Sequence, residues 1–151
     1  MSRFALLLLA PVLLCGCRMF SSAPPKHTEE VTVGTRNSRV LFEAVVLGLQ
    51  KEGFSVGQGA DPGKNEVVTG WRVNASPFKG KGYRERATVN FSPAETEGES
   101  LVTCRVERET NESFRPLLEG SAKWERAPDP EDVPKRVLAF IDAYLQPGLP
   151  Q

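Results

Sequence analysis

Side chains that carry most enzyme chemistry are scarce in this chain of 151 residues, which contains a single histidine and three cysteines. Ser-His-acid and Cys-His catalysis both need a base that activates the nucleophile, and a zinc site needs several nitrogen or sulfur ligands. The histidine, His27, has no second histidine or cysteine beside it. Paired carboxylates of the glycosidase kind stay open as an alternative, without a motif in their favour. We therefore expect a protein that is not an enzyme and that needs no metal or cofactor.

An excess of charge of either sign is also absent. The chain has 19 lysines and arginines against 19 aspartates and glutamates, and its formal net charge is zero. Such a balance gives no overall field that would draw in a polyanion. Nucleic acid is therefore not an expected partner.

The sequence lacks an apolar run long enough to span a bilayer, which takes about 20 residues. Its longest apolar run, Phe4 to Leu14, follows Arg3 and leads into the small-residue step Cys15-Gly16. A basic start, an apolar middle and a small-residue end form the three-part layout of an export signal. The chain is thus expected to leave the cytoplasm.

The end of this segment resembles the lipobox of bacterial lipoprotein signal peptides, because Leu14, Cys15, Gly16 and Cys17 stand there in order. The resemblance implies cleavage before Cys17 and acylation of its thiol and new amino group. Each buried CH₂ contributes about 0.8 kcal/mol, so two or more acyl chains hold a protein firmly on a membrane. In such lipoproteins a residue other than Asp after the lipidated cysteine favours the outer membrane, and Arg18 fits this rule. We expect a lipid anchor in the outer membrane, facing the periplasm, or in the cell membrane where there is only one.

One cysteine remains for the folded part, because Cys15 leaves with the signal and Cys17 carries lipid. Cys104 therefore has no partner for a disulfide within the chain. It alternates with Val102 and Val106, which favours a buried position over the alternative of a reactive thiol.

The sequence divides into a signal peptide (1–16), a lipidated cysteine with a flexible linker (17–30), one domain (31–146) and a short tail (147–151). Serine, proline and charged residues without an apolar period fill the linker, as is typical of flexible segments. His27 lies in it and is expected to be a solvated side chain without a role.

Within the domain, apolar residues recur either at every second position or at helical spacing, which distinguishes strands from helices. The pattern predicts strands at Val31–Val33, Phe54–Gln58, Val67–Val73, Tyr83–Phe91, Val102–Glu107 and Ala122–Arg126, and helices at Asn37–Glu52 and Asp129–Tyr144. Alternation in the third strand puts Trp71 on the face of Val67 and Arg72 on the other. This order predicts an α+β two-layer sandwich, an antiparallel meander of four or five strands with two helices on one face.

This order of elements, with the stretch LQKEGFSV at Leu49–Val56 after the lipid anchor, resembles the helix-grip domains of BamC-type outer-membrane lipoproteins. Those proteins carry two such domains and a long unstructured N-terminal segment, whereas this chain has one domain and a short linker. The resemblance implies an accessory role in outer-membrane assembly and an envelope protein as partner. It does not fix the oligomeric state.

One cluster of cations is a candidate contact for an anionic ligand such as a lipid headgroup or a glycan. It comprises Lys79, Lys81, Arg84 and Arg86, interleaved with two aromatic residues and two glycines. Glycines let a backbone approach an anion closely and cations neutralise it. The alternative is a flexible loop whose arginines pair across the sheet with acids such as Glu107.

Two functions fit these observations. The first is a lipid-anchored scaffold that binds protein partners without catalysis. The second is a carrier for a lipid or other small apolar ligand held between a helix and the sheet, with Leu47, Trp71, Val89 and Phe91 as its candidate lining.

The anchor yields the first testable prediction. Mass spectrometry of the mature protein is expected to find Cys17 as its first residue, with the mass of its acyl chains. The Cys17→Ser chain should lack that mass, because it lacks the thiol that accepts lipid, whereas Cys104→Ser should keep it. A mature wild-type chain that is not acylated, or that begins elsewhere, would contradict the prediction.

Overall fold

The computed structural model describes residues 24–57, 60–76, 78–113 and 122–146. The predicted signal peptide, the predicted lipobox with Cys17 and the predicted tail 147–151 lie outside the described residues. In the ranges that are described, no helix is both long enough and apolar enough to cross a membrane.

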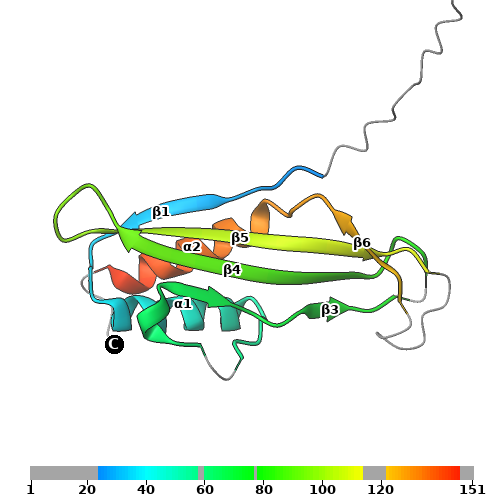
Figure 1. The fold of residues 1–151 in the computed structure, drawn as a ribbon, viewed down its shortest axis with the longest axis horizontal. Helices are drawn as coiled ribbons and strands as arrows, with labels where there is room; N and C mark the ends of the chain where they lie inside the picture. The colour runs from blue at the N-terminus through cyan, green and yellow to red at the C-terminus, as the bar shows by residue number, and fades with distance from the viewer. Residues whose placement is uncertain (1–23, 58–59, 77, 114–121, 147–151) are drawn as a thin grey trace, which may run out of the picture.

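The described strands form one antiparallel sheet (Figure 1). Its order is β1-β5-β4-β2, while β3 pairs with β4 and β6 pairs with β5. The bounds are β1 Glu29–Val33, β2 Glu66–Val68, β3 Arg72–Asn74, β4 Tyr83–Pro93, β5 Ser100–Asn111 and β6 Trp124–Ala127. The sheet is built around the long hairpin of β4 and β5.

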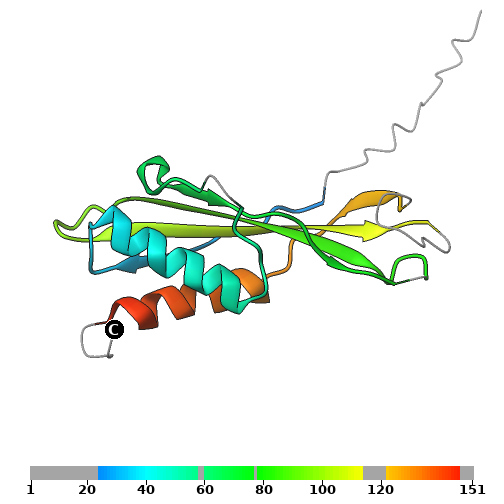
Figure 2. The same ribbon diagram turned by 90° about the horizontal axis from the view of Figure 1, so that it is seen from below.

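Two α-helices, α1 (Ser38–Lys51) and α2 (Asp132–Leu145), pack on one face of this sheet (Figure 2). The side chain of Asn37 caps α1 by accepting from the N–H groups of Arg39 and Val40. Gly53 ends the helix in the left-handed region, with φ at 79°. The helices touch at Gly48, where a Cβ atom would lie 3.2 Å from Phe140 Cδ1. The predicted α+β two-layer architecture is confirmed.

The core lies between the helices and the half of the sheet that they cover. Alternate residues of the hairpin are buried in it, and so are the inner stripes of both helices. Cys104 is fully buried, as its alternation with valines predicted. Burial raises the pKa of its thiol to about 12, so the thiol stays protonated and unreactive at neutral pH.

Some strand predictions were wrong. The sheet has six described strands, against the four or five expected for the meander, and β1 joins it beside β5. The described part of Phe54–Gln58 makes a single bridge, Val56 to Thr69, rather than a strand. The predicted strand Val67–Val73 is interrupted between β2 and β3.

That interruption shifts the register by one residue. Val68 pairs with Thr88 and Arg72 pairs with Glu85. The chain from β2 to β3 thus advances four residues while β4 advances three, and this extra residue is a β-bulge. The hydroxyl of Thr69 accepts the N–H of Ala87 at 3.0 Å, in place of a backbone carbonyl. Past the bulge the alternation is reversed, so Arg72 lies on the helix face and Trp71 on the opposite face. The prediction that Trp71 shares a face with Val67 is therefore wrong.

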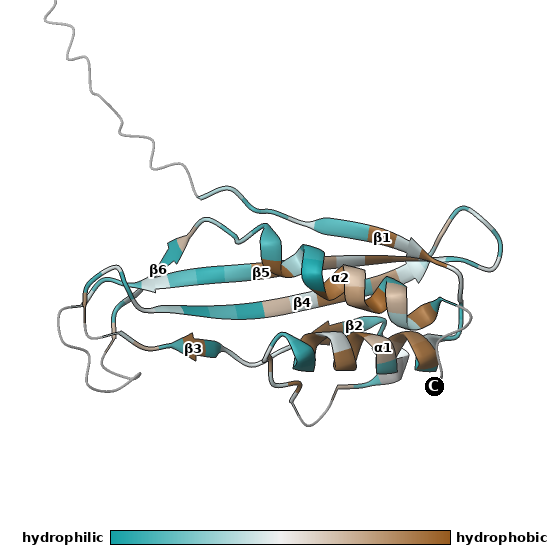
Figure 3. Ribbon diagram, turned by 180° about the vertical axis from the view of Figure 1, so that it is seen from behind, coloured by the Kyte–Doolittle hydropathy of each residue, from teal (hydrophilic) through white to brown (hydrophobic). Residues whose placement is uncertain are grey.

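The hairpin extends well past the helices (Figure 3). We call the uncovered part, made of β3, β6 and the adjoining ends of β4 and β5, the arm. Its ribbon is mostly hydrophilic, whereas the half under the helices is mostly hydrophobic. The change in composition along one pair of strands marks where the helix layer stops.

The ordered chain begins earlier than predicted, because β1 starts at Glu29 and His27 contacts the domain. The His27 side chain is 30% exposed, with Nε2 2.7 Å from Glu29 Oε1. Its backbone N–H donates to Asp129 Oδ2 at 3.1 Å. The expectation of a solvated histidine in the linker is wrong, because the buried Asp129 carboxylate holds this segment against the domain.

Candidate functional site

The arm presents side chains on two faces because successive residues of a strand point to opposite sides. On β4, Glu85 points to the side of the helices, while Arg84 and Arg86 point to the open face, the side without described helices. The reader of Figure 1 looks onto the open face. The two faces carry different clusters.

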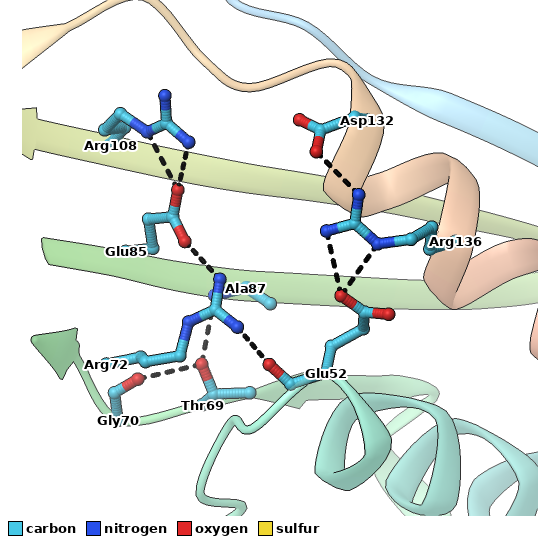
Figure 4. A network of polar contacts seen from close by, with 9 residues as sticks. All are labelled: Glu52, Thr69, Gly70, Arg72, Glu85, Ala87, Arg108, Asp132 and Arg136. Carbon is cyan, nitrogen blue, oxygen red and sulfur yellow. Dashed lines mark hydrogen bonds and ion pairs between the residues drawn. The ribbon is translucent and has the colours of Figure 1, made fainter. Parts of the chain in front are cut away.

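On the helix side, Glu85 is the centre of an ionic cluster (Figure 4). Its side chain is 0% exposed. Arg108 Nε donates to Glu85 Oε1 at 2.8 Å, and Arg72 Nη2 donates to Oε2. A carboxylate is costly to bury unless cations and hydrogen bonds compensate for its lost hydration. Two guanidiniums supply both here, and we call Arg72, Glu85 and Arg108 the Glu85 cluster.

The Glu85 cluster is tied to both helices. Arg72 Nη1 donates to the carbonyl oxygen of Glu52, just past the end of α1. The Glu52 carboxylate accepts from Arg136 Nε at 3.0 Å, and Arg136 Nη1 donates to Asp132 Oδ2 at 2.6 Å. This chain of contacts joins the arm to the covered half where the helix layer ends. Because the buried carboxylate is fully partnered, we assign it to stability rather than to binding.

The open face carries a stack of arginine and tryptophan side chains. The Arg84 guanidinium carbon lies 4.4 Å from the ring centre of Trp71 and 4.9 Å from that of Trp124. Arg86 lies 4.8 Å from the Trp71 ring. Cations in this range are attracted to aromatic ring faces. We call Trp71, Arg84, Arg86 and Trp124 the arginine–tryptophan stack.

Acids on β5 fix both arginines of the stack. Arg84 Nε is 2.7 Å from Glu109 Oε2, and Arg86 Nη2 is 2.8 Å from Glu107 Oε2. The hydrogen bond from Arg86, helped by the nearby Arg105 charge, holds the pKa of Glu107 below its usual value against the effect of burial. Both arginines therefore pair with acids across the sheet. The pairing of Arg86 with Glu107 is the one that we expected if the cations belonged to a flexible loop rather than to a ligand site.

The four cations predicted as one cluster are divided between two places. Arg84 and Arg86 belong to the stack, whereas Lys79 and Lys81 lie in the loop between β3 and β4. Lys79 Nζ is 3.3 Å from Glu112 Oε2, and Lys81 is exposed. The four cations therefore do not form one binding site for an anionic ligand.

The four residues considered as the lining of an apolar hollow do not meet. Val89 and Phe91 are buried in the core at 0% and 4% exposure. Leu47 is 39% exposed on α1, and Trp71 lies on the open face against Arg84. The carrier hypothesis therefore loses its proposed lining.

Sequence reasoning missed Trp124 as a site residue and placed Trp71 on the wrong face. The only signal for Trp124 was a short predicted strand centred on it. Among the described residues, buried Arg86 Nε and Trp124 Nε1 have no hydrogen-bond partner. Val68, 46% exposed, extends the open face beside the stack. This face therefore combines aromatic, cationic and apolar surface.

Comparisons with known proteins assign no family to the chain. No family model matches it, and no curated protein matches it. Among solved structures it is similar to a TBP-like protein from Parabacteroides distasonis, with 10% identity over 79% of this chain and 83% of that chain and a TM-score of 0.37. A likeness this distant says nothing of what the chain binds.

Asp129, a fully buried carboxylate near the open face, generates a prediction about pH. Burial alone raises its pKa, but the N–H of His27 and the guanidiniums of Arg105 and Arg126 outweigh burial and hold the pKa below its usual value. The unfolded chain, with an aspartate pKa of about 3.9, then binds more protons than the folded chain in acid. Stability from Asp129 is therefore complete above about pH 4 and is lost as the pH falls further.

The check is urea unfolding of the wild type and Asp129→Asn across this acid range. We expect the free energy of unfolding of the wild type to fall with pH, and the Asn variant to start lower and fall less steeply. An equal slope in the two proteins would show that Asp129 contributes nothing to the pH dependence.

Proposed function

We propose that this protein is a lipid-anchored envelope protein without catalytic activity, whose domain binds a partner protein through the open face of the arm. The observation that carries the proposal is the arginine–tryptophan stack at the surface. The acylated Cys17 would hold the domain at the outer membrane on its periplasmic side. The BamC-type resemblance supports an envelope protein as partner, in an accessory role in outer-membrane assembly.

The composition of the stack supports protein binding. Tryptophan and arginine are enriched among the few residues that supply most of the binding energy in protein interfaces. The Arg84 side chain is 23% exposed and that of Arg86 41% exposed. Part of each is therefore available to a partner, and Val68 provides apolar surface beside them.

The rigidity of the stack also supports the proposal. Each of its arginines is held by a cross-strand carboxylate and by an indole ring. A long side chain that is already ordered loses little conformational entropy on binding, whereas a free one costs about 0.5–1.5 kcal/mol. The open face is thus preorganised for binding.

Site-specific photocrosslinking in cells tests this proposal. A photoreactive residue at Thr88, on the open face beyond Arg86, should crosslink the same envelope protein in repeated captures. The same residue at Glu43, exposed on α1 in the other layer, is the matched control and should not. Equal crosslinking from both positions, or none from Thr88, would count against the open face.

Truncation of Trp71, which contacts both arginines of the stack, gives a prediction of how far the crosslink yield should fall. Trp71→Ala in the Thr88 crosslinker chain should lower the crosslink yield by about tenfold or more, because truncating an aromatic anchor typically costs about 2 kcal/mol. Leu47→Ala, a truncation on the exposed side of α1, should leave the yield unchanged. Urea unfolding checks that both variants stay folded, and an undiminished yield in folded Trp71→Ala would contradict the proposal.

A further inference from the structure

The loop at the end of the arm exposes an aromatic side chain that two lysines follow in the sequence. Phe78 is 69% exposed, with Lys79 and Lys81 next to it in the loop. Burying a phenylalanine side chain is worth about 1.5–3 kcal/mol, so exposure on this scale is unfavourable in water. Exposed aromatic rings with lysines near them are typical of surfaces that enter the headgroup region of a membrane.

Backbone hydrogen bonds join residues 78–82 of this loop to one another and to the end of β5. Gly80 N–H donates to Asn111 O at 2.6 Å, and Asn111 N–H donates to Gly82 O at 2.8 Å. Lys81 N–H closes a turn onto Phe78 O at 3.1 Å. We call residues 78–81 the arm tip.

The N-terminal segment leaves the domain toward this same end (Figure 1). Glu29 pairs with Cys104 in antiparallel register, so residues before Glu29 advance in the direction that β5 takes after Cys104. Asn111, at the base of the arm tip, lies seven residues beyond Cys104, or about 23 Å along a strand. The segment 24–28 runs in that direction, so the described chain begins on the side of the domain toward which the arm extends.

The remaining linker is short. Seven residues, 17–23, separate this point from the end of the signal peptide, and even fully extended they reach about 25 Å. A lipid attached at Cys17 therefore keeps the arm side of the domain within reach of the membrane surface. Because the tether holds the tip at a high local concentration, a contact of low intrinsic affinity is enough for persistent binding.

We infer that the arm tip is a second membrane contact, in which Phe78 enters the headgroup region of the membrane that holds the anchor and the exposed Lys81 faces its anionic headgroups. The inference rests on the proposed lipid anchor at Cys17. Two attachment points restrict the orientation of the arm as well as its distance from the membrane. The open face would then stay within reach of partners in the same membrane.

The test uses the full lipidated protein in vesicles of phosphatidylethanolamine and phosphatidylglycerol. A polarity-sensitive fluorophore is attached at Lys81→Cys on the arm tip or, as a control, at Glu97→Cys in the β4–β5 loop at the opposite end. The buried thiol of Cys104 does not compete for the label in the folded protein. We expect emission from the tip label to shift to the blue on vesicles relative to detergent, emission from the control label to stay unchanged, and Phe78→Ser to remove the tip shift.

Flotation of the vesicles separates the two ways of failing. If the labelled protein does not float with the vesicles, the lipid anchor is wrong and the inference falls with it. If it floats while the tip label still reports water, or if Phe78→Ser leaves the shift intact, the anchor stands and only the second contact is contradicted.

Discussion

The arm depends on the burial of one carboxylate, that of Glu85, between two guanidiniums. The helices cover only part of the hairpin of β4 and β5, so the arm lacks the apolar layer that stabilises the other half. Where that layer ends, Glu85 binds Arg72 and Arg108, and Arg72 also donates to the carbonyl oxygen of Glu52, the first residue after α1. A charged group this deeply buried is stable only with its partners in place. It therefore fixes where β3 and β5 lie on either side of β4.

The same strands hold the open face, so the two clusters are coupled through the sheet. The bulge between β2 and β3 puts Arg72 beside Glu85 and, one residue away, Trp71 beside Arg84. Without the extra residue, alternation would turn Trp71 to the helix side of the sheet and Arg72 to the open face. One shift of register thus creates both the cluster that holds the arm and the surface that we propose binds a partner.

Local patterns in the sequence were enough to predict the two layers of the fold. The capped stripe of Asn37–Glu52 and the alternation in Tyr83–Phe91 each contain their own signal, since periodicity and capping depend on neighbouring residues. The Glu85 cluster joins residues 13 and 23 positions apart, and its pairing follows from strand register rather than from any motif. The bulge was not predictable either, because Gly70-Trp71 reads as part of an unbroken alternation. The four cations predicted as one cluster are close in sequence but lie in two places, because strand register and not sequence distance decides which side chains meet.

The central claim is that Glu85 keeps the arm ordered as a platform, and native-state hydrogen exchange of Glu85→Ala tests it most directly. The matched control is Glu43→Ala, which removes one carboxylate of an exposed pair with Arg39. The account predicts that Glu85→Ala loses amide protection in β3, β6 and the adjoining ends of β4 and β5, while the half under the helices keeps it and the control changes neither. Unchanged protection in the arm, or a uniform loss over the whole domain, would contradict it.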